Sequence, residues 1–482
     1  MGVQPLSAGP GHRIRPRLLG GPSLLGAVLL AGLVQGCSAT AQLLGQGPRP
    51  LPLPAGIELA FNHRLGPRYR SPIDGQWRQG DDLEAFLLES INAAREEILV
   101  AVQELSLPRV AEALVARHRQ GLRVQVVLEN TYSAPWSEAH PADLAPHQRH
   151  RQAQLQALGW GDAVAILRAG GVPMLDDTAD GSAGSGLMHH KFVVIDRRVV
   201  VTGSANFTAS GIHGDPDDPR SRGNVNHLLR LTSPELAALF IEEFARLWGD
   251  GPGGASDSRF GLAKHNPGLK TVRIGGTSVG VLFAPHRRSD PNHGLALLRS
   301  LLEQTHAQAD LALFVFSDQR LAEALGALQQ RGGTVRLLAD PGFATRSFSE
   351  VLDLLGVALP DHRCGLEAGN APLKQPLEGV GTPRLAGGDK LHHKMAVLDH
   401  RRVITGSFNW SPSAAHQNDE TLLVIDSPLV AAHFTGEIDR LWKGAELGIT
   451  ARLARKQERQ RLRCGSGRLR PAPAKGPIDA AT

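Results

Sequence analysis

The chain contains one segment twice. Residues 187–207, LMHHKFVVIDRRVVVTGSANF, align without a gap on residues 390–410, KLHHKMAVLDHRRVITGSFNW. Further similarity continues on both sides, up to Trp248 in the first copy and Trp442 in the second, with one insertion at 214–223 in the first copy. A repeat of this kind marks two copies of one structural unit. We therefore expect two homologous lobes of about 180 residues each.

Within each copy, apolar strand-like runs alternate with helical patterns. The runs EILVAVQEL, LRVQVVLEN and KFVVID are apolar throughout, and LEAFLLESINAAREE has the spacing of an amphipathic helix. Strands that are apolar on both faces pack between helices. The sequence thus predicts an α/β fold of two homologous α/β/α sandwich lobes packed about a pseudo-twofold axis. The predicted boundaries are 57–248 for lobe 1, 249–268 for a Gly- and Pro-rich linker, and 269–445 for lobe 2.

The N-terminal residues 1–37 predict a signal peptide of the lipoprotein type. A basic stretch, HRIRPR, precedes an apolar run, and VQGC at Cys37 resembles a lipobox. We expect an exported protein that is held at the membrane by lipid on Cys37, with residues 38–56 as a linker. Two alternatives stay open: ordinary cleavage near Ala41, which leaves a periplasmic or secreted protein, and an uncleaved apolar anchor.

Charge is concentrated at the two ends. The whole chain has a net charge of +5, but residues 1–37 carry +3 and residues 451–482 carry +7, which leaves about −5 on the body. The tail, 446–482, suits contact with anionic lipid or nucleic acid, and a solvated tail is the alternative. Cys364 and Cys464 lie 100 residues apart, one of them in this tail, which favours unpaired thiols over a disulfide.

Each copy also carries a His-x-Lys motif followed by an Asp five residues after the Lys. Strand periodicity places the His and Lys of a motif on one face, and His190 and His393 on the other. The Asp of each motif falls at a hairpin turn, which suggests a supporting role. A Gly-Ser-x-Asn segment follows on the returning strand and puts Ser and Asn on a shared face. The motif residues are His189, Lys191, Asp196, Ser204 and Asn206, then His392, Lys394, Asp399, Ser407 and Asn409.

Two lysines, two asparagines and two serines form a group of hydrogen-bond donors that suits the oxygens of a phosphate. One imidazole is then available as a nucleophile at phosphorus and the other as an acid and base. A purely structural role would bury two ammonium groups without anions, which is costly. No Cys cluster or HExxH pattern supports a zinc site, so we expect no metal and no cofactor.

These motifs resemble the phospholipase D superfamily, phosphodiesterases with a duplicated HxKxxxxD motif followed by GSxN. The resemblance implies one active site between the lobes and a phosphohistidine intermediate, with both motif aspartates in the catalytic set. It implies that His189 is the nucleophile, that His392 is the acid and base, and that the phosphoryl group is held by Lys191, Lys394, Asn206 and Asn409.

The superfamily often adds an Asn-x-Glu whose carboxylate orients the histidine of its own motif. Glu420 fits this pattern and is expected beside His392, whereas the matching residue of the first copy is Asn226. A carboxylate stabilises an imidazolium better than an amide does. This asymmetry favours His392 as the proton carrier.

The motif specifies the bond better than the substrate. We expect hydrolysis of phosphatidyl head groups at a phospholipid membrane. Open alternatives are an exported nuclease, a phosphatidyl transferase and a noncatalytic phosphate-binding protein. The negative net charge of the body disfavours a long polyanion such as nucleic acid as the substrate, whereas the basic tail favours one. The head group and the oligomeric state stay open.

Overall fold

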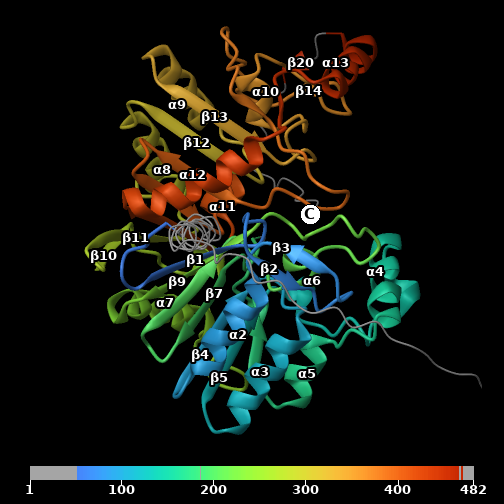
Figure 1. Ribbon diagram of the computed structural model, residues 1–482, viewed down its shortest axis with the longest axis vertical. Coiled ribbons are helices and arrows are strands. Elements are labelled where there is room, and N and C mark those ends of the chain that lie inside the picture. Colours follow the sequence, from blue (N-terminus) through green and yellow to red (C-terminus); the bar gives the residue numbers. More distant parts are fainter. Residues whose placement is uncertain (1–50, 185, 466–467, 470–482) are drawn as a thin grey trace, which may run out of the picture. The chain divides into compact units, whose positions relative to one another are not determined.

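A computed structural model describes residues 51–184, 186–465 and 468–469 (Figure 1). The predicted signal peptide and Cys37 lie outside these residues, as does most of the tail beyond 465. The described residues from Pro52 onward belong to one compact unit. Within the described part, no helix has both the length and the apolar character needed to cross a bilayer.

Lobe 1 is built on a seven-stranded sheet in the order β1-β9-β8-β7-β4-β5-β6. β4, β5 and β6 run parallel, and the other neighbouring strands pair antiparallel. The strands are β1 (Ile57–Phe61), β4 (Glu97–Val102), β5 (Arg123–Leu128), β6 (Met174–Asp176), β7 (Lys191–Ile195), β8 (Val199–Gly203) and β9 (His227–Thr232). The helices are α2 (Leu83–Ala93), α3 (Pro108–Arg119), α4 (Pro146–Ala157), α5 (Ala163–Ala169), α6 (Ala209–Ile212) and α7 (Pro234–Trp248), and a separate hairpin joins β2 (Arg68–Arg70) to β3 (Trp77–Gln79).

Lobe 2 repeats this plan in a nine-stranded sheet, in the order β10-β11-β18-β17-β16-β12-β13-β15-β19. Its strands are β10 (Lys270–Ile274), β11 (Thr277–Ala284), β12 (Gln308–Leu313), β13 (Thr334–Ala339), β15 (Val380–Thr382), β16 (Lys394–Leu398), β17 (Arg402–Gly406), β18 (Glu420–Asp426) and β19 (Glu446–Leu447). Its helices are α8 (Gly294–Glu303), α9 (Gln319–Gln330), α10 (Glu350–Leu354), α11 (Pro412–His416) and α12 (Pro428–Trp442). The chain continues into α13 (Ala451–Cys464), and a small parallel sheet pairs β14 (Gly365–Leu366) with β20 (Arg468–Leu469).

Each sheet lies between two layers of side chains, and one of these layers is shared. The outer faces of the sheets pack against α2, α3 and α5 in lobe 1 and against α8, α9 and α10 in lobe 2. The inner faces share one apolar cluster that includes Phe240 of α7, Phe434 of α12, Phe61 of β1 and Phe283 of β11. The predicted fold of two α/β/α lobes is confirmed, because the two halves bury their inner faces in a common core.

Asp196 and Asp399 hold the turns of equivalent hairpins. The β7–β8 turn places Asp196 at φ 49°, and the β16–β17 turn places Asp399 at φ 48°. The Asp196 carboxylate accepts the backbone N–H groups of residues 95–97, and Asp399 accepts those of residues 306–308. A strand advances about 3.3 Å per residue, so the Cα atom of each aspartate lies roughly 16 Å along the chain from that of the lysine in its motif. Including the two aspartates in the catalytic set was therefore wrong, and the supporting role is the correct one.

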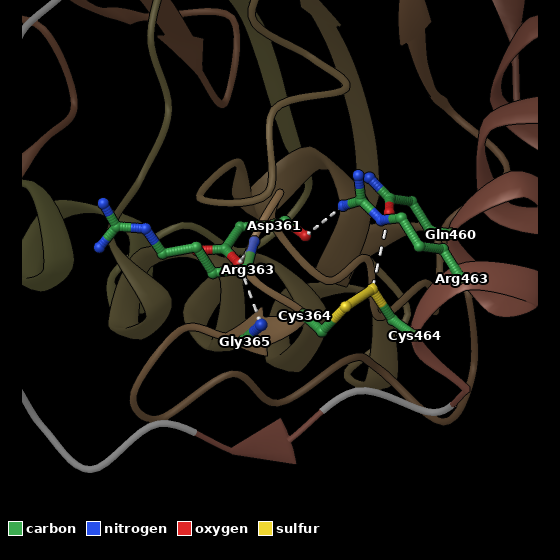
Figure 2. Close-up of a disulfide and its surroundings, with 7 residues drawn as sticks. All are labelled: Asp361, Arg363, Cys364, Gly365, Gln460, Arg463 and Cys464. Atoms are coloured by element: carbon green, nitrogen blue, oxygen red, sulfur yellow. Dashed lines mark hydrogen bonds between the residues drawn. A yellow bond between two sulfur atoms is a disulfide. The ribbon is translucent and has the colours of Figure 1, made fainter.

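The expectation of unpaired cysteines was also wrong. Cys364 and Cys464 form a disulfide with their Cα atoms 5.2 Å apart (Figure 2). Helix α13 turns back onto lobe 2, where Leu453 is buried in the outer apolar cluster. The guanidinium of Arg463 donates to the backbone carbonyl of Asp361, three residues before Cys364. The basic tail therefore begins as a helix that is covalently fixed to lobe 2, which sequence separation alone does not indicate.

Candidate active site at the lobe boundary

The two His-x-Lys motifs lie where the lobes meet, and the opposite lobe holds the backbone of each histidine. The backbone N–H of His189 donates to the carbonyl of Asp419 at 2.9 Å, and that of His392 donates to the carbonyl of Val225 at 3.1 Å. Single β-bridges next to these bonds join Met188 to Asp419 and Val225 to Leu391. The backbones of the two halves thus exchange equivalent contacts, as expected for a pseudo-twofold relation.

The side chains of the two histidines are held across the same boundary. His189 Nδ1 lies 2.8 Å from Glu420 Oε2, and His392 Nδ1 lies 3.0 Å from Asn226 Oδ1. The expectation that Glu420 orients His392 was therefore wrong. The carboxylate comes from the second copy but supports the histidine of the first copy, because β9 and β18 each begin at the lobe boundary. In both pairs an Nδ1–H donor to oxygen leaves Nε2 as the free ring nitrogen.

The two lysines lie beside these rings without an ion-pair partner among the described residues. Lys191 Nζ donates to the carbonyl of His189 at 2.9 Å and to Gln103 Oε1 at 3.3 Å, and Lys394 Nζ donates to the carbonyl of His392 at 2.9 Å. Both side chains are fully buried. Burial lowers the pKa of Lys191 to about 7, against the attraction of Glu420. Burial and then the charge of Lys191 hold the pKa of Lys394 well below its usual range. An anion bound between two such ammonium groups would offset their desolvation.

Each asparagine has a buried amide oxygen without a hydrogen-bond partner. Asn206 Nδ2 donates to Gln103 Oε1 at 3.2 Å. The Oδ1 atoms of Asn206 and Asn409 are buried and make no hydrogen bond. Orphaned polar atoms are rare in a folded protein and indicate a missing partner. The amide ends are exchangeable by rotation, so each side chain can present its NH₂ to a ligand oxygen.

The serines do not have the role predicted for them. Ser204 Oγ donates to Asn226 Oδ1 at 2.8 Å, and Ser407 Oγ donates to Glu420 Oε2 at 2.6 Å. A hydroxyl has one proton to donate, and here it is already used. The prediction that Ser204 and Ser407 bind phosphate is therefore corrected, because in this arrangement they position the residues that hold the histidine rings.

His190 and His393 face away from the site, as strand periodicity predicts. His190 Nε2 lies 3.0 Å from Glu243, and His393 Nε2 lies 3.2 Å from Glu437. Sequence analysis missed a further member of this layer, Lys264. From the linker it forms a buried ion pair with Glu243 and with Asp419, the residue whose carbonyl holds His189. Nothing in the repeat indicated this lysine, because the linker has no counterpart.

Gln103 and Phe314 were missed as well. They follow the apolar runs of β4 and β12 at matching positions of the repeat. Gln103 contacts Lys191 and Asn206, whereas the Phe314 ring lies 4.7 Å from His392, with Lys394 Nζ 4.8 Å from its centroid. The sequence could have indicated both residues, because each is the first bulky residue after an aligned strand. One side chain is an amide and the other an aromatic ring, so the two sides of the site differ.

The arrangement favours nucleophilic attack by a neutral imidazole. Burial, followed by the charges of Lys191 and Lys394, holds the pKa of both histidines well below its ordinary value. Burial raises the pKa of Glu420 to about 7, and the charge of Lys191 opposes this shift. Among the described residues, no three His, Cys, Asp or Glu side chains gather closely enough to bind a metal ion.

Comparison with known proteins shows the family to which the chain belongs. The family model "Cardiolipin synthase, PLD-like domain" matches residues 87–248 and 298–442, well over half of the chain. The human protein "Mitochondrial cardiolipin hydrolase" is 28% identical over 169 residues, 35% of this chain and 52% of that protein. Its Xenopus tropicalis namesake is 31% identical over 155 residues, which is 32% of this chain and 64% of the relative. A "Phospholipase D" of Rickettsia prowazekii is 26% identical over 133 residues, 28% of this chain and 55% of the relative.

These matches cover part of each relative, and the chain spans about half the length of the human protein. The crystal structure of phosphatidylserine synthase from Haemophilus influenzae is similar over 82% of this chain and 89% of its own, with a TM-score of 0.51 and 14% identity. At that identity the likeness concerns the fold alone. With both motif copies in place and the family model matching both halves, the chain belongs to the phospholipase D superfamily.

Proposed function

We propose that this protein is a phosphodiesterase that works through a phosphohistidine and hydrolyses phosphatidyl lipids. One observation carries the proposal: two histidines with free Nε2 atoms, each held across the lobe boundary, lie beside two buried lysines that form no direct ion pair with any described residue. A phosphodiester carries the negative charge that this group of donors lacks. Lys191, Lys394, Asn206 and Asn409 are then the residues that hold its nonbridging oxygens.

In the first step, the Nε2 lone pair of His189 forms a bond to phosphorus, and the bond from phosphorus to the leaving oxygen breaks. Burial and the lysine charges keep His392 neutral in the empty site; the bound anion offsets the lysine charges, so His392 takes up a proton from water at Nε2 when the diester binds. The leaving oxygen then takes that proton from Nε2 of His392. The phosphorylated ring of His189 becomes positive, and Glu420, 2.8 Å from Nδ1, stabilises that charge. The position of Glu420 therefore supports His189 as the nucleophile. The sequence argument reached the same assignment for another reason, because it placed this carboxylate beside His392.

In the second step, His392 removes a proton from water and the water oxygen bonds to phosphorus, while the bond from phosphorus to His189 breaks. Asn226 accepts the Nδ1–H of His392 and fixes its tautomer. Because an amide stabilises an imidazolium less than a carboxylate does, a protonated His392 is a good acid, and its neutral form is a weak base. The second step is therefore the slower one in this proposal.

Phosphatidyl substrates are supported by the names of the relatives, cardiolipin hydrolase and phospholipase D, which describe those proteins. The predicted export signal supports them as well, since an exported protein tethered by lipid lies next to phospholipid. Cleavage of nucleic acid is the competing outcome, and the substrate experiment below separates the two.

Substitution of the two histidines is expected to block different steps of the reaction. His189→Ala should abolish turnover of every diester, because no atom remains to bond to phosphorus. His392→Ala should still attack a diester with a good leaving group, such as bis(4-nitrophenyl) phosphate, and accumulate the phosphoenzyme. Phosphopeptide mapping locates the label. Label on His392 in the His189→Ala variant would reverse the two roles.

Substrate binding should weaken as pH rises. The pKa of Lys191 is lowered to about 7, so its ammonium is charged below that pH and is lost above it. We expect KM for a soluble diester to rise above about pH 7, by up to about 10-fold per pH unit for one ionising group. Lys191→Arg keeps its charge and should remove the part of this rise that Lys191 contributes, leaving any part due to Lys394. A KM that is constant across the same range in the native protein contradicts the assignment of Lys191 to the phosphate.

The substrate class is tested by offering the full chain phosphatidylcholine vesicles and single-stranded DNA side by side, in chelator. Release of the head group without DNA cleavage is expected. DNA cleavage without release of a head group would replace the lipid proposal by a nuclease, and the same His189→Ala variant is the control for both activities. Activity that returns only with added metal would contradict the proposed chemistry.

We also propose that the protein is exported and held at the membrane by lipid on Cys37. The sequence of residues 1–37 is the support for this. Intact mass of the mature protein from a bacterial host should show a chain that begins at a lipid-modified Cys37, and Cys37→Ser should lose the added mass. A mature chain that begins after Ala41 would contradict lipidation.

A further inference from the structure

Helix α13 presents a rigid cationic surface that the catalytic chemistry does not use. It carries six basic side chains and one acidic side chain, and it lies outside the segments that the family model matches. The disulfide to Cys364 fixes its C-terminal end, and Leu453 is buried against lobe 2 near its first turn. A basic helix that is held at both ends keeps its charges in a fixed arrangement, which a solvated tail would not do.

One face of this helix is exposed and rich in arginine. Leu462 lies nine residues after the buried Leu453, which at about 3.6 residues per turn places it on the opposite side of the helix. Its side chain is 73% exposed. Arg452, Arg455 and Arg459 lie on the same side as Leu462, are exposed, and make no hydrogen bond or ion pair with any residue that the structure describes. We call these four residues the basic face of α13.

Helix α13, through Lys456 beside the basic face, contacts one loop of lobe 2 that leads to His392. Lys456 Nζ donates to the carbonyl of Thr345 at 2.6 Å. In the same loop the guanidinium of Arg346 lies 5.8 Å from the ring of Phe343. That ring packs at 4.6 Å on Phe314, the residue that contacts His392. Helix α13 and His392 are thus joined by one series of contacting residues in lobe 2.

We propose that the basic face of α13 docks the protein on an anionic phospholipid bilayer. This inference deepens the proposed function and rests on it for the choice of a lipid partner. Three unpaired arginines complement the charge of anionic head groups. The exposed apolar residues beside them are aliphatic: Leu462 on the face and Ile449, 52% exposed, just before the helix. Aliphatic side chains among arginines suit the boundary between head groups and acyl chains, whereas a single-stranded nucleic acid would need exposed aromatic rings for stacking.

The test uses the full chain and reads the docking surface locally. Hydrogen exchange of residues 449–464 is measured with vesicles of phosphatidylcholine alone and with vesicles of phosphatidylcholine and phosphatidylglycerol in equal parts. We expect protection by the anionic vesicles, lost at high salt, and no protection by the neutral ones. The triple variant Arg452→Gln, Arg455→Gln, Arg459→Gln should lose this protection and bind anionic vesicles at least about 10-fold more weakly.

A matched control removes three exposed arginines elsewhere: Arg119→Gln, Arg273→Gln, Arg299→Gln. This control variant should keep the protection of residues 449–464 by anionic vesicles, although its net charge changes as much as that of the Arg452 triple variant. Hydrolysis of a soluble diester should be unchanged in both triple variants, which shows that they fold, and His189→Ala should keep docking but lose hydrolysis. The proposal is overturned by equal protection in the native and the Arg452 triple variant, by protection with neutral vesicles, or by protection with single-stranded DNA but not with anionic vesicles.

Discussion

The candidate site depends on contacts that each lobe makes with the histidine of the other. Glu420 and Asn226 stand at equivalent positions of the repeat, and each holds the Nδ1 atom of a histidine across the boundary. Backbone hydrogen bonds to Asp419 and Val225 reinforce the same exchange. Neither half contains the complete candidate site, because the group that orients its histidine belongs to the other half. Folding of the shared core and assembly of the site are consequently one event.

This dependence explains how the structure tolerates a group of buried ionisable side chains whose desolvation is unfavourable. Two ammonium groups and two imidazoles are buried near one carboxylate, and desolvation is the largest cause of the pKa shift at Lys191, Lys394 and both histidines. The large apolar cluster that joins the inner faces of the two sheets supplies the opposing stabilisation. Buried cations arranged in this way suit an anion, since a bound anion would offset part of their desolvation.

The asymmetry between the halves has a chemical meaning that the repeat by itself hides. Gln103 in lobe 1 corresponds to Phe314 in lobe 2, and Asn226 corresponds to Glu420. One histidine therefore has a carboxylate partner, and the other has an amide partner and an aromatic neighbour. On the lobe 2 side, the rings of Phe314 and Phe343 pack beside the loop that Lys456 of α13 contacts. Duplication supplied two equal histidines, and divergence of the residues around them is what gives the two histidines different chemical environments.

Much of the fold followed from the sequence, because it depends on local periodicity. The repeat determined two lobes, apolar runs determined buried strands, and alternation along KFVVID placed His189 and Lys191 together and His190 on the other face. The aspartates were assigned to turns for the same reason. The period of apolar residues and the spacing of motif residues are properties of one strand. They specify which face of the strand a side chain occupies, but not which residue lies opposite it across an interface. Tertiary structure alone decided that Glu420 serves His189, that the serines bond to Glu420 and Asn226, that Lys264 enters the buried layer, and that Cys464 reaches Cys364. Each of these contacts joins residues far apart in the chain, and only the packing of complete elements brings them together.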